Sequence, residues 1–158
     1  MADLGIDLVA NPGLVYLRGE VFSFWRGDDQ DHLCVLLVRS MLDAGVRVSL
    51  ASDHPCGSFS PAEVIWTAET HRLQRGGSID AAEAITPEEV LRLYTINAAH
   101  ASNRADRAGS IEVGKVANLV VLDRDIVTCA RDDIRHAHVE MINVDGMKEF
   151  ERANGSDS

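Results

Sequence analysis

The fold is decided by the stretch Val46-Arg47-Val48-Ser49-Leu50-Ala51-Ser52-Asp53-His54-Pro55, a β-rich run that ends in an acid, a histidine and a proline. This run predicts a strand with the Asp53 carboxylate at its tip. In α/β proteins, ligands bind and catalysis takes place at the carboxyl ends of parallel strands, because the loops there vary while the sheet holds them in place. Asp53 is therefore the first catalytic candidate. Local physics allows a second interpretation, in which Asp53 only forms an Asx turn before Pro55.

The segments before this strand predict one more strand and one helix. Residues 7–11 form a short apolar run stopped by Pro12, which is typical of a buried strand with a turn at its tip. The stretch that follows, up to residue 29, mixes aromatic residues with glycines and charges without a clear period and predicts an ordered loop over a site. Residues 31–44 show helical spacing, and Gly45 follows where a left-handed residue ends a helix.

Two capping motifs predict the helices after Asp53. Ser60-Pro61-Ala62-Glu63 opens a helix that runs to about residue 73, and Thr86-Pro87-Glu88-Glu89 opens another that ends or bends near residues 97–100. The alternation of strands and helices indicates parallel βα units. A complete eight-fold barrel needs about 250 residues. With 158 residues and two visible units, the chain cannot be a whole barrel.

The last third of the chain has a different residue pattern. Residues 108–123 place glycine-bearing turns around short strands, and residues 139–144 read as a strand that enters a tight turn at Asp145-Gly146. These patterns predict a small β module. Residues 153–158 have the composition of a frayed tail.

Composition and charge exclude several classes of partner. The net charge is -10, and neither lysine nor arginine clusters, so nucleic acid and anionic membrane surfaces are not expected partners. No apolar stretch approaches a membrane span, and the N-terminus lacks the pattern of a signal peptide, which predicts a cytoplasmic protein. Cys34, Cys56 and Cys129 are odd in number and widely spaced, which favours reduced thiols; Cys56 follows Asp53 and could face the same cleft.

Three motifs occur in an order that resembles the C-terminal part of metal-dependent amidohydrolases. The resemblance is greatest to the YtcJ-like branch of the amidohydrolase-3 group and covers nearly the whole chain. Its motifs are Ser52-Asp53-His54-Pro55, Thr95-Ile96-Asn97-Ala98-Ala99 and Gly109-Ser110-Ile111-Glu112-Val113-Gly114-Lys115-Val116-Ala117-Asn118-Leu119-Val120-Val121-Leu122-Asp123, together with Asn11-Pro12.

The resemblance implies an α/β fold, a C-terminal fragment of a (β/α)8 TIM barrel plus part of a small β-sandwich. In that family the sandwich is built from segments at both ends of the chain. Residues 1–106 would hold the last two βα units and the helices after them. Residues 107–150 would form the C-terminal share of the sandwich, and residues 151–158 a disordered tail.

The resemblance also implies a role for Asp53, which would contact a divalent metal, with zinc expected, and would act as general base and acid. His54 adjoins Asp53 and could bind substrate or orient the acid; the other interpretation is a plain loop residue. A divalent ion lowers the pKa of bound water from far above neutrality toward about 7, so a nearby carboxylate can accept the proton. The family's His-x-His and its other metal ligands would lie upstream of Met1. One carboxylate cannot make a catalytic zinc site, so we do not expect this fragment alone to retain metal.

The other histidines and the tryptophans have weaker claims to a site. His136-Ala137-His138 has metal-ligand spacing, but it follows the Val-Leu-Asp strand, where the resemblance puts a sandwich edge far from the barrel mouth. A surface or packing role is expected there. Solvated or structural roles are also expected for the remaining histidines, and packing for the tryptophans, although Trp25 could line a pocket. These residues are His32, His71, His100, Trp25 and Trp66.

The leading hypothesis is the C-terminal portion of an amidohydrolase that acts on non-peptide C–N bonds of small amides or N-acyl compounds and is inactive by itself. The alternative is a noncatalytic truncated barrel or interaction module that has lost its metal site. The expected partner of the chain is the missing N-terminal part of the barrel or another copy of the chain, because a quarter-barrel exposes open sheet edges.

Overall fold

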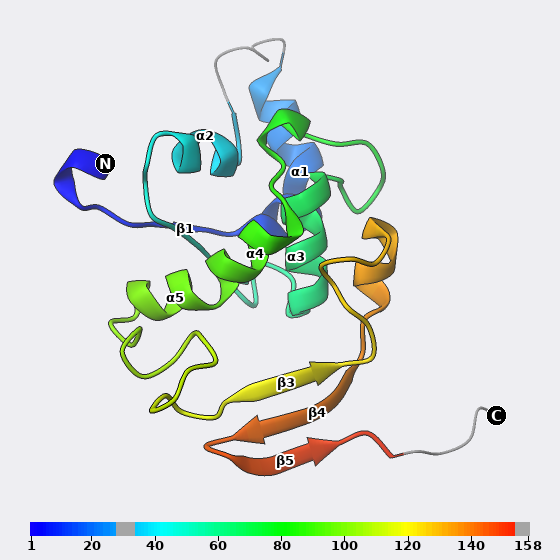
Figure 1. The fold of residues 1–158 in the computed structure, drawn as a ribbon. Helices are drawn as coiled ribbons and strands as arrows, with labels where there is room; N and C mark the ends of the chain where they lie inside the picture. Colours follow the sequence, from blue (N-terminus) through cyan, green and yellow to red (C-terminus); the bar gives the residue numbers. More distant parts are fainter. Residues whose placement is uncertain (28–33, 154–158) are drawn as a thin grey trace.

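The computed structural model describes residues 1–27 and 34–153. It has a helical part built on two parallel strands and, below it in Figure 1, a three-stranded antiparallel sheet. In chain order the elements are η1 (Ala2–Leu4), β1 (Leu8–Ala10), α1 (Pro12–Arg26), α2 (Val38–Asp43), β2 (Val48–Leu50), α3 (Pro61–Thr70), η2 (Ala81–Glu83), α4 (Pro87–Tyr94), α5 (Ile96–Ala101), β3 (Leu119–Leu122), η3 (Arg131–His136), β4 (Val139–Val144) and β5 (Met147–Glu151).

The two strands expected at the start of the chain pair with each other in parallel. Leu8 lies opposite Val48 and Ala10 lies opposite Leu50. Their carboxyl ends therefore meet at one edge of the sheet, as the strand-and-carboxylate pattern predicted. This edge is where the loop with Asp53 begins.

The loop expected up to residue 29 is wrong for residues 12–26, which form the 15-residue helix α1. The two glycines of this stretch, taken as turn residues in the sequence pattern, lie instead where α1 packs closely on its neighbours. A Cβ atom at Gly19 would lie 2.1 Å from the Leu73 side chain, and one at Gly13 would lie 3.0 Å from the Ser58 backbone nitrogen. The helix starts with Pro12 in its first turn, where a missing N–H costs nothing.

The helix expected over residues 31–44 is shorter in the structure, where α2 begins at Val38. Residues 28–33 lie outside the described residues. The Val35 backbone N–H donates to the Asp80 carboxylate at 2.6 Å, so a tertiary contact takes the place of a helical hydrogen bond. Gly45 is left-handed at φ 74°, and its N–H donates to the Leu42 carbonyl, which confirms the predicted end of the helix.

Helices α3 and α4 begin as predicted. The Thr86 hydroxyl accepts from the Glu89 N–H, and the Glu89 side chain accepts from the Thr86 N–H, which completes a capping box. The Ser60 hydroxyl accepts from the Glu63 N–H at 3.4 Å. The Glu63 carboxylate accepts instead from the Ser58 hydroxyl, so the reciprocal half of that box is replaced by a contact to the preceding loop.

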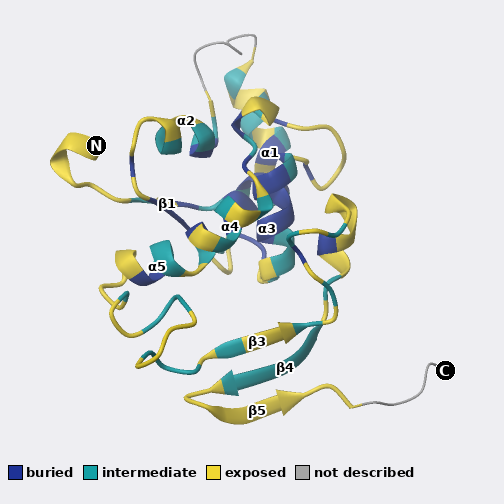
Figure 2. Ribbon diagram, in the orientation of Figure 1, coloured by how far each residue is buried: buried dark blue, intermediate teal, exposed yellow. Residues whose placement is uncertain are grey.

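One hydrophobic core holds the helical part together (Figure 2). It is formed where α4 packs on β2 and α3 packs on α1 and α4, and Val48 and Val90 are fully buried in it. Ile134 of η3 is 1% exposed and belongs to the same core, so η3 attaches the C-terminal segment to α3.

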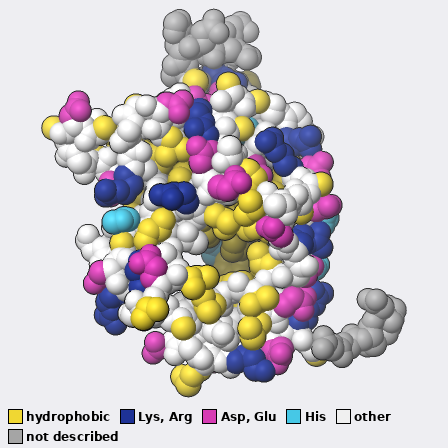
Figure 3. Space-filling model, viewed as in Figure 1, with side chains coloured by type: hydrophobic (Ala, Val, Ile, Leu, Met, Phe, Trp, Pro, Cys, Tyr) yellow, Lys and Arg dark blue, Asp and Glu magenta, His cyan; other side chains and the backbone are white. Residues whose placement is uncertain are grey.

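The sheet β3–β4–β5 has no buried residue. Val120, Met147 and Phe150 are exposed at 58%, 66% and 45%, which leaves apolar side chains uncovered. Acidic and basic side chains are intermixed over the face seen in Figure 3. Strand β5 includes Glu151, the first residue of the expected tail, and residues 154–158 lie outside the described residues.

The α/β class is confirmed. No helix among the described residues has the length and apolar character needed to cross a membrane. The three cysteines are free thiols; Cys34 and Cys56 are exposed and Cys129 is half-buried.

Candidate functional site

The loop after β2 presents Asp53 to solvent at the carboxyl edge of the parallel pair. Asp53 is exposed and adopts a left-handed conformation with φ 53°, which aspartate tolerates better than most residues. The Gly57 N–H donates to the Asp53 carbonyl at 2.8 Å. A Cβ atom at Gly57 would lie 1.9 Å from the Ser52 carbonyl oxygen, so the loop can double back this tightly only with glycine there.

His54 lies beside Asp53 and is also exposed. Its ring packs edge-on against Phe59, with ring centroids 5.3 Å apart. Neither the Asp53 carboxylate nor the His54 ring hydrogen-bonds to any residue that the structure describes. Both groups are therefore available to a ligand, and their roles stay predictions.

Asn11 lies at the end of the neighbouring strand. The Ala51 N–H donates to the Ala10 carbonyl at 3.0 Å, so Asn11 emerges next to the start of the Asp53 loop. Asn11 is the N-cap residue of α1 but its side chain does not cap the helix. Its Oδ1 atom is buried without a hydrogen-bond partner among the described residues.

Polar contacts that the sequence pattern did not indicate hold the Asp53 loop against the helices. The Ser58 hydroxyl donates to Glu63, and the other Glu63 carboxylate oxygen lies 3.9 Å from the Arg135 guanidinium on η3. The Asn97 side chain donates to the Val48 carbonyl at 2.7 Å, which fixes α5 against β2. The only sequence signal for the first contact was Glu63 in its capping motif.

The described residues do not by themselves fit a metal ion. Among residues 1–27 and 34–153, no group of three or more histidine, cysteine, aspartate or glutamate side chains has the arrangement needed to hold one. Asp53 offers a single exposed carboxylate, whereas a catalytic zinc ordinarily takes three protein ligands.

The remaining histidines and tryptophans lie outside the Asp53 loop. His136 ends η3 and His138 precedes β4, so the pair is not on one strand face; both are exposed. His71 is fully buried with Nδ1 2.9 Å from the Ile79 carbonyl oxygen, and burial lowers the pKa of its imidazole. His100 is exposed on α5, and His32 lies outside the described residues.

Trp66 is 3% exposed and packs in the core, which confirms a packing role for it. Trp25 is 71% exposed and contacts Phe22 on α1. Because α1 leads away from the strand tips for 15 residues, Trp25 lies about 20 Å along the helix from its start. It is therefore not part of the Asp53 loop.

Sequence comparisons show likeness over most of the chain. The chain is 60% identical over 152 residues to an N-substituted formamide deformylase of Arthrobacter pascens, covering 96% of this chain and 28% of the deformylase. It is 38% identical over 130 residues to an imidazolonepropionase of Bacillus cytotoxicus, covering 77% of this chain and 26% of that enzyme. The chain thus spans little more than a quarter of the length of these relatives.

A crystal structure of an adenosine deaminase from Xanthomonas campestris, solved with bound zinc, has a similar fold. It is 20% identical, with a TM-score of 0.63 over 98% of this chain and 35% of the deaminase. The model of the amidohydrolase family matches residues 1–147. This match, together with the identity to the deformylase, shows that the chain belongs to the amidohydrolase family.

Proposed function

We propose that the chain is the C-terminal portion of a cytoplasmic, YtcJ-like amidohydrolase that hydrolyses non-peptide C–N bonds of small amides or N-acyl compounds with a metal-activated water. The observation that carries this proposal is the 60% identity to the N-substituted formamide deformylase. The exposed Asp53 at the end of a parallel strand supports it, because this is where α/β enzymes place catalytic groups.

In this proposal β1 and β2 are the last two strands of a (β/α)8 barrel, and β3–β5 are the C-terminal share of a sandwich. An isolated two-stranded sheet is marginally stable. A hollow of about 340 Å³, lined mainly by apolar side chains of β1, α1 and residues 35–41, lies along β1. The exposed apolar side chains of the β3–β5 sheet likewise suit a covering partner. That partner is the N-terminal part of the barrel or another copy of the chain.

Asp53 is the proposed catalytic residue. Its carboxylate accepts a proton from the attacking water and gives it to the leaving nitrogen as the C–N bond breaks. His54, beside it, contacts the substrate. Asp53 is also the one ligand that this chain contributes to a divalent metal, with zinc expected. The other ligands come from polypeptide outside these 158 residues, so the chain alone is inactive and does not retain the ion.

The test combines the chain with the polypeptide that corresponds to the N-terminal three quarters of the deformylase relative. Zinc content after dialysis and release of amine from an N-aryl formamide are measured for each piece and for the mixture. We expect both zinc and activity only in the mixture. Asp53→Asn should abolish activity and leave association intact, because it keeps the shape and removes the base; Asp3→Asn, an exposed carboxylate on η1, is the control.

Two outcomes would overturn the proposal. An associated, zinc-loaded mixture without hydrolysis of formamides or acetamides would favour the noncatalytic module. Full activity of the mixture that contains Asp53→Asn would show that Asp53 is not a catalytic residue.

A further inference from the structure

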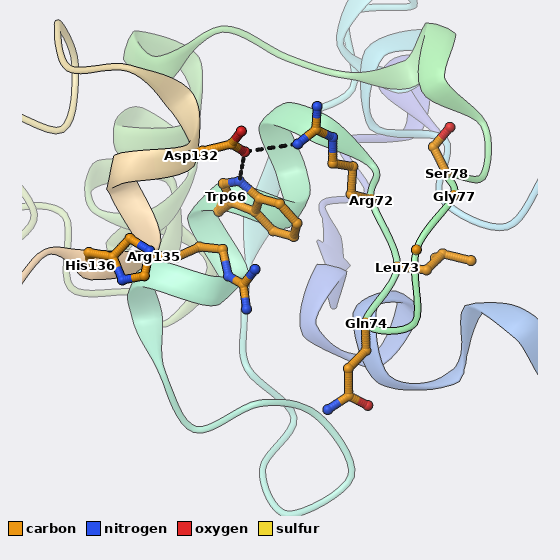
Figure 4. Close-up of a pocket in the computed structure, with 10 residues that line it drawn as sticks. Trp66, Arg72, Leu73, Gln74, Gly77, Ser78, Asp132, Arg135 and His136 are labelled. Carbon is orange, nitrogen blue, oxygen red and sulfur yellow. Dashed lines mark hydrogen bonds and ion pairs between the residues drawn. The ribbon is translucent and has the colours of Figure 1, made fainter.

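A second hollow, of about 650 Å³, lies at the junction of α3, the turn that follows it and η3. None of its lining residues belongs to the loop 51–60 (Figure 4). Two arginines and one aspartate line it in a chain whose net charge is -10, so its local charge is opposite in sign to that of the molecule. The polar side chains of its lining include Gln74, Ser78 and His136 besides Arg72, Asp132 and Arg135.

Arg72 and Arg135 lie on either side of the Trp66 indole (Figure 4). Arg72 pairs with Asp132 at 2.9 Å, and the two side chains are 54% and 69% exposed. An exposed pair of this kind contributes little stability, so a carboxylate from solution can compete for the guanidinium.

Arg135 is held in place by aromatic side chains. Its guanidinium carbon lies 4.6 Å from the Trp66 ring centroid and 5.6 Å from that of Tyr16, and it donates to the Tyr16 hydroxyl at 3.0 Å. The carboxylate that it faces, Glu63, is 3.9 Å away. Because a guanidinium has five N–H donors, Arg135 keeps donors for a ligand while its position is fixed in advance.

Three more polar side chains face no partner. The Gln74 amide, the Ser78 hydroxyl and the His136 ring make no hydrogen bond within the described part of the chain. Each can donate a hydrogen bond to an oxyanion. The hollow therefore presents two guanidinium groups and three further donors against the single carboxylate of Asp132.

We propose that this hollow binds a small dicarboxylate anion. Planar carboxylates match the paired N–H groups of arginine. Because the two guanidinium groups lie on either side of the indole, they suit an anion that has two separate carboxylates. One carboxylate displaces Asp132 from Arg72, and the other meets Arg135 and its neighbouring donors. The site lies outside the Asp53 loop, although Arg135 also contacts Glu63, which holds that loop.

Succinate is the probe, with acetate and inorganic phosphate as comparisons. Trp66 is one of only two tryptophans, so Trp25→Phe leaves it as the reporter for a fluorescence titration. We expect saturable binding of succinate, at least tenfold tighter than that of acetate, from the charge-assisted hydrogen bonds at the second guanidinium. Arg72→Gln should weaken binding about tenfold. Arg75→Gln, on the same turn but outside the lining, should leave it unchanged.

Asp132→Asn gives the opposite sign. The substitution removes the carboxylate charge that competes for Arg72. In the wild type the Trp66 N–H donates to Asp132 at 3.2 Å, and the asparagine amide oxygen can still accept that hydrogen bond. We expect succinate to bind several-fold tighter to this variant. No saturation below about 50 mM succinate, equal binding of acetate, preferred binding of phosphate, or an equal loss in Arg75→Gln would each overturn the proposal.

Discussion

Glu69→Gln should remove a large pH dependence from the stability of the chain. Glu69 lies in the last turn of α3, its side chain is fully buried, and both carboxylate oxygens lack a hydrogen-bond partner among the described residues. Burial raises the pKa of Glu69 from 4.5 to about 7; the charge of Arg131 opposes this shift and that of Glu88 adds to it.

The sign and size of the effect follow from linkage. Because the folded state holds the Glu69 proton more tightly than the unfolded chain, this group stabilises the fold fully below pH 4.5 and loses that contribution as the pH rises to about 7. At about 1.4 kcal/mol per pKa unit, the loss is about 3 kcal/mol, of which about 2 kcal/mol falls above pH 5.5. Glutamine resembles the protonated acid and has no proton to lose.

The assay is urea unfolding of the wild type and of Glu69→Gln between pH 5.5 and 8.5. This range avoids the isoelectric point near 4.9, because a protein is least soluble at its isoelectric point. The difference in unfolding free energy should grow by about 2 kcal/mol in favour of the variant as the pH rises. Glu149→Gln, on exposed β5, should show no such growth. A constant difference between Glu69→Gln and wild type across this range would refute the reasoning.

Gly57→Ala should destabilise the chain by about 1–3 kcal/mol and displace the Asp53 loop, because the added Cβ would lie 1.9 Å from the Ser52 carbonyl oxygen. Urea unfolding beside Cys56→Ala, an exposed neighbour, measures this, and equal stability of the two variants would contradict the packing argument. Thr86→Ala should cost about 1 kcal/mol through loss of the capping box of α4. The same unfolding assay tests it, and a loss below about 0.3 kcal/mol would show that the cap is replaced by water.

Local patterns predicted the elements whose signals lie within a few residues of each other. The strand that ends before Asp53, the cap at Thr86 and the left-handed Gly45 belong to this group. Helix α1 does not, because the role of Gly19 depends on Leu73, far along the chain, and a glycine in isolation indicates a turn.

The candidate site divides in the same way. Asp53 and His54 were found because they directly follow an apolar strand and match a family motif. The contacts that involve Arg135 could not be predicted, since Arg135 reaches Tyr16 across 119 positions of sequence and no local pattern indicates such a contact. The burial of Glu69 likewise comes from tertiary packing around an ordinary helical glutamate.

The parallel pairing of β1 and β2 sets an order of folding events. Leu8 meets Val48 only after about 40 intervening residues are brought together, whereas β4 and β5 are joined by a two-residue turn. Contacts close in sequence form with less loss of chain entropy, so we expect the β4–β5 hairpin to form before the β1–β2 pair that positions the Asp53 loop. The position of the Asp53 carboxylate thus depends on a long-range pairing that is complete only when β2 has entered the core.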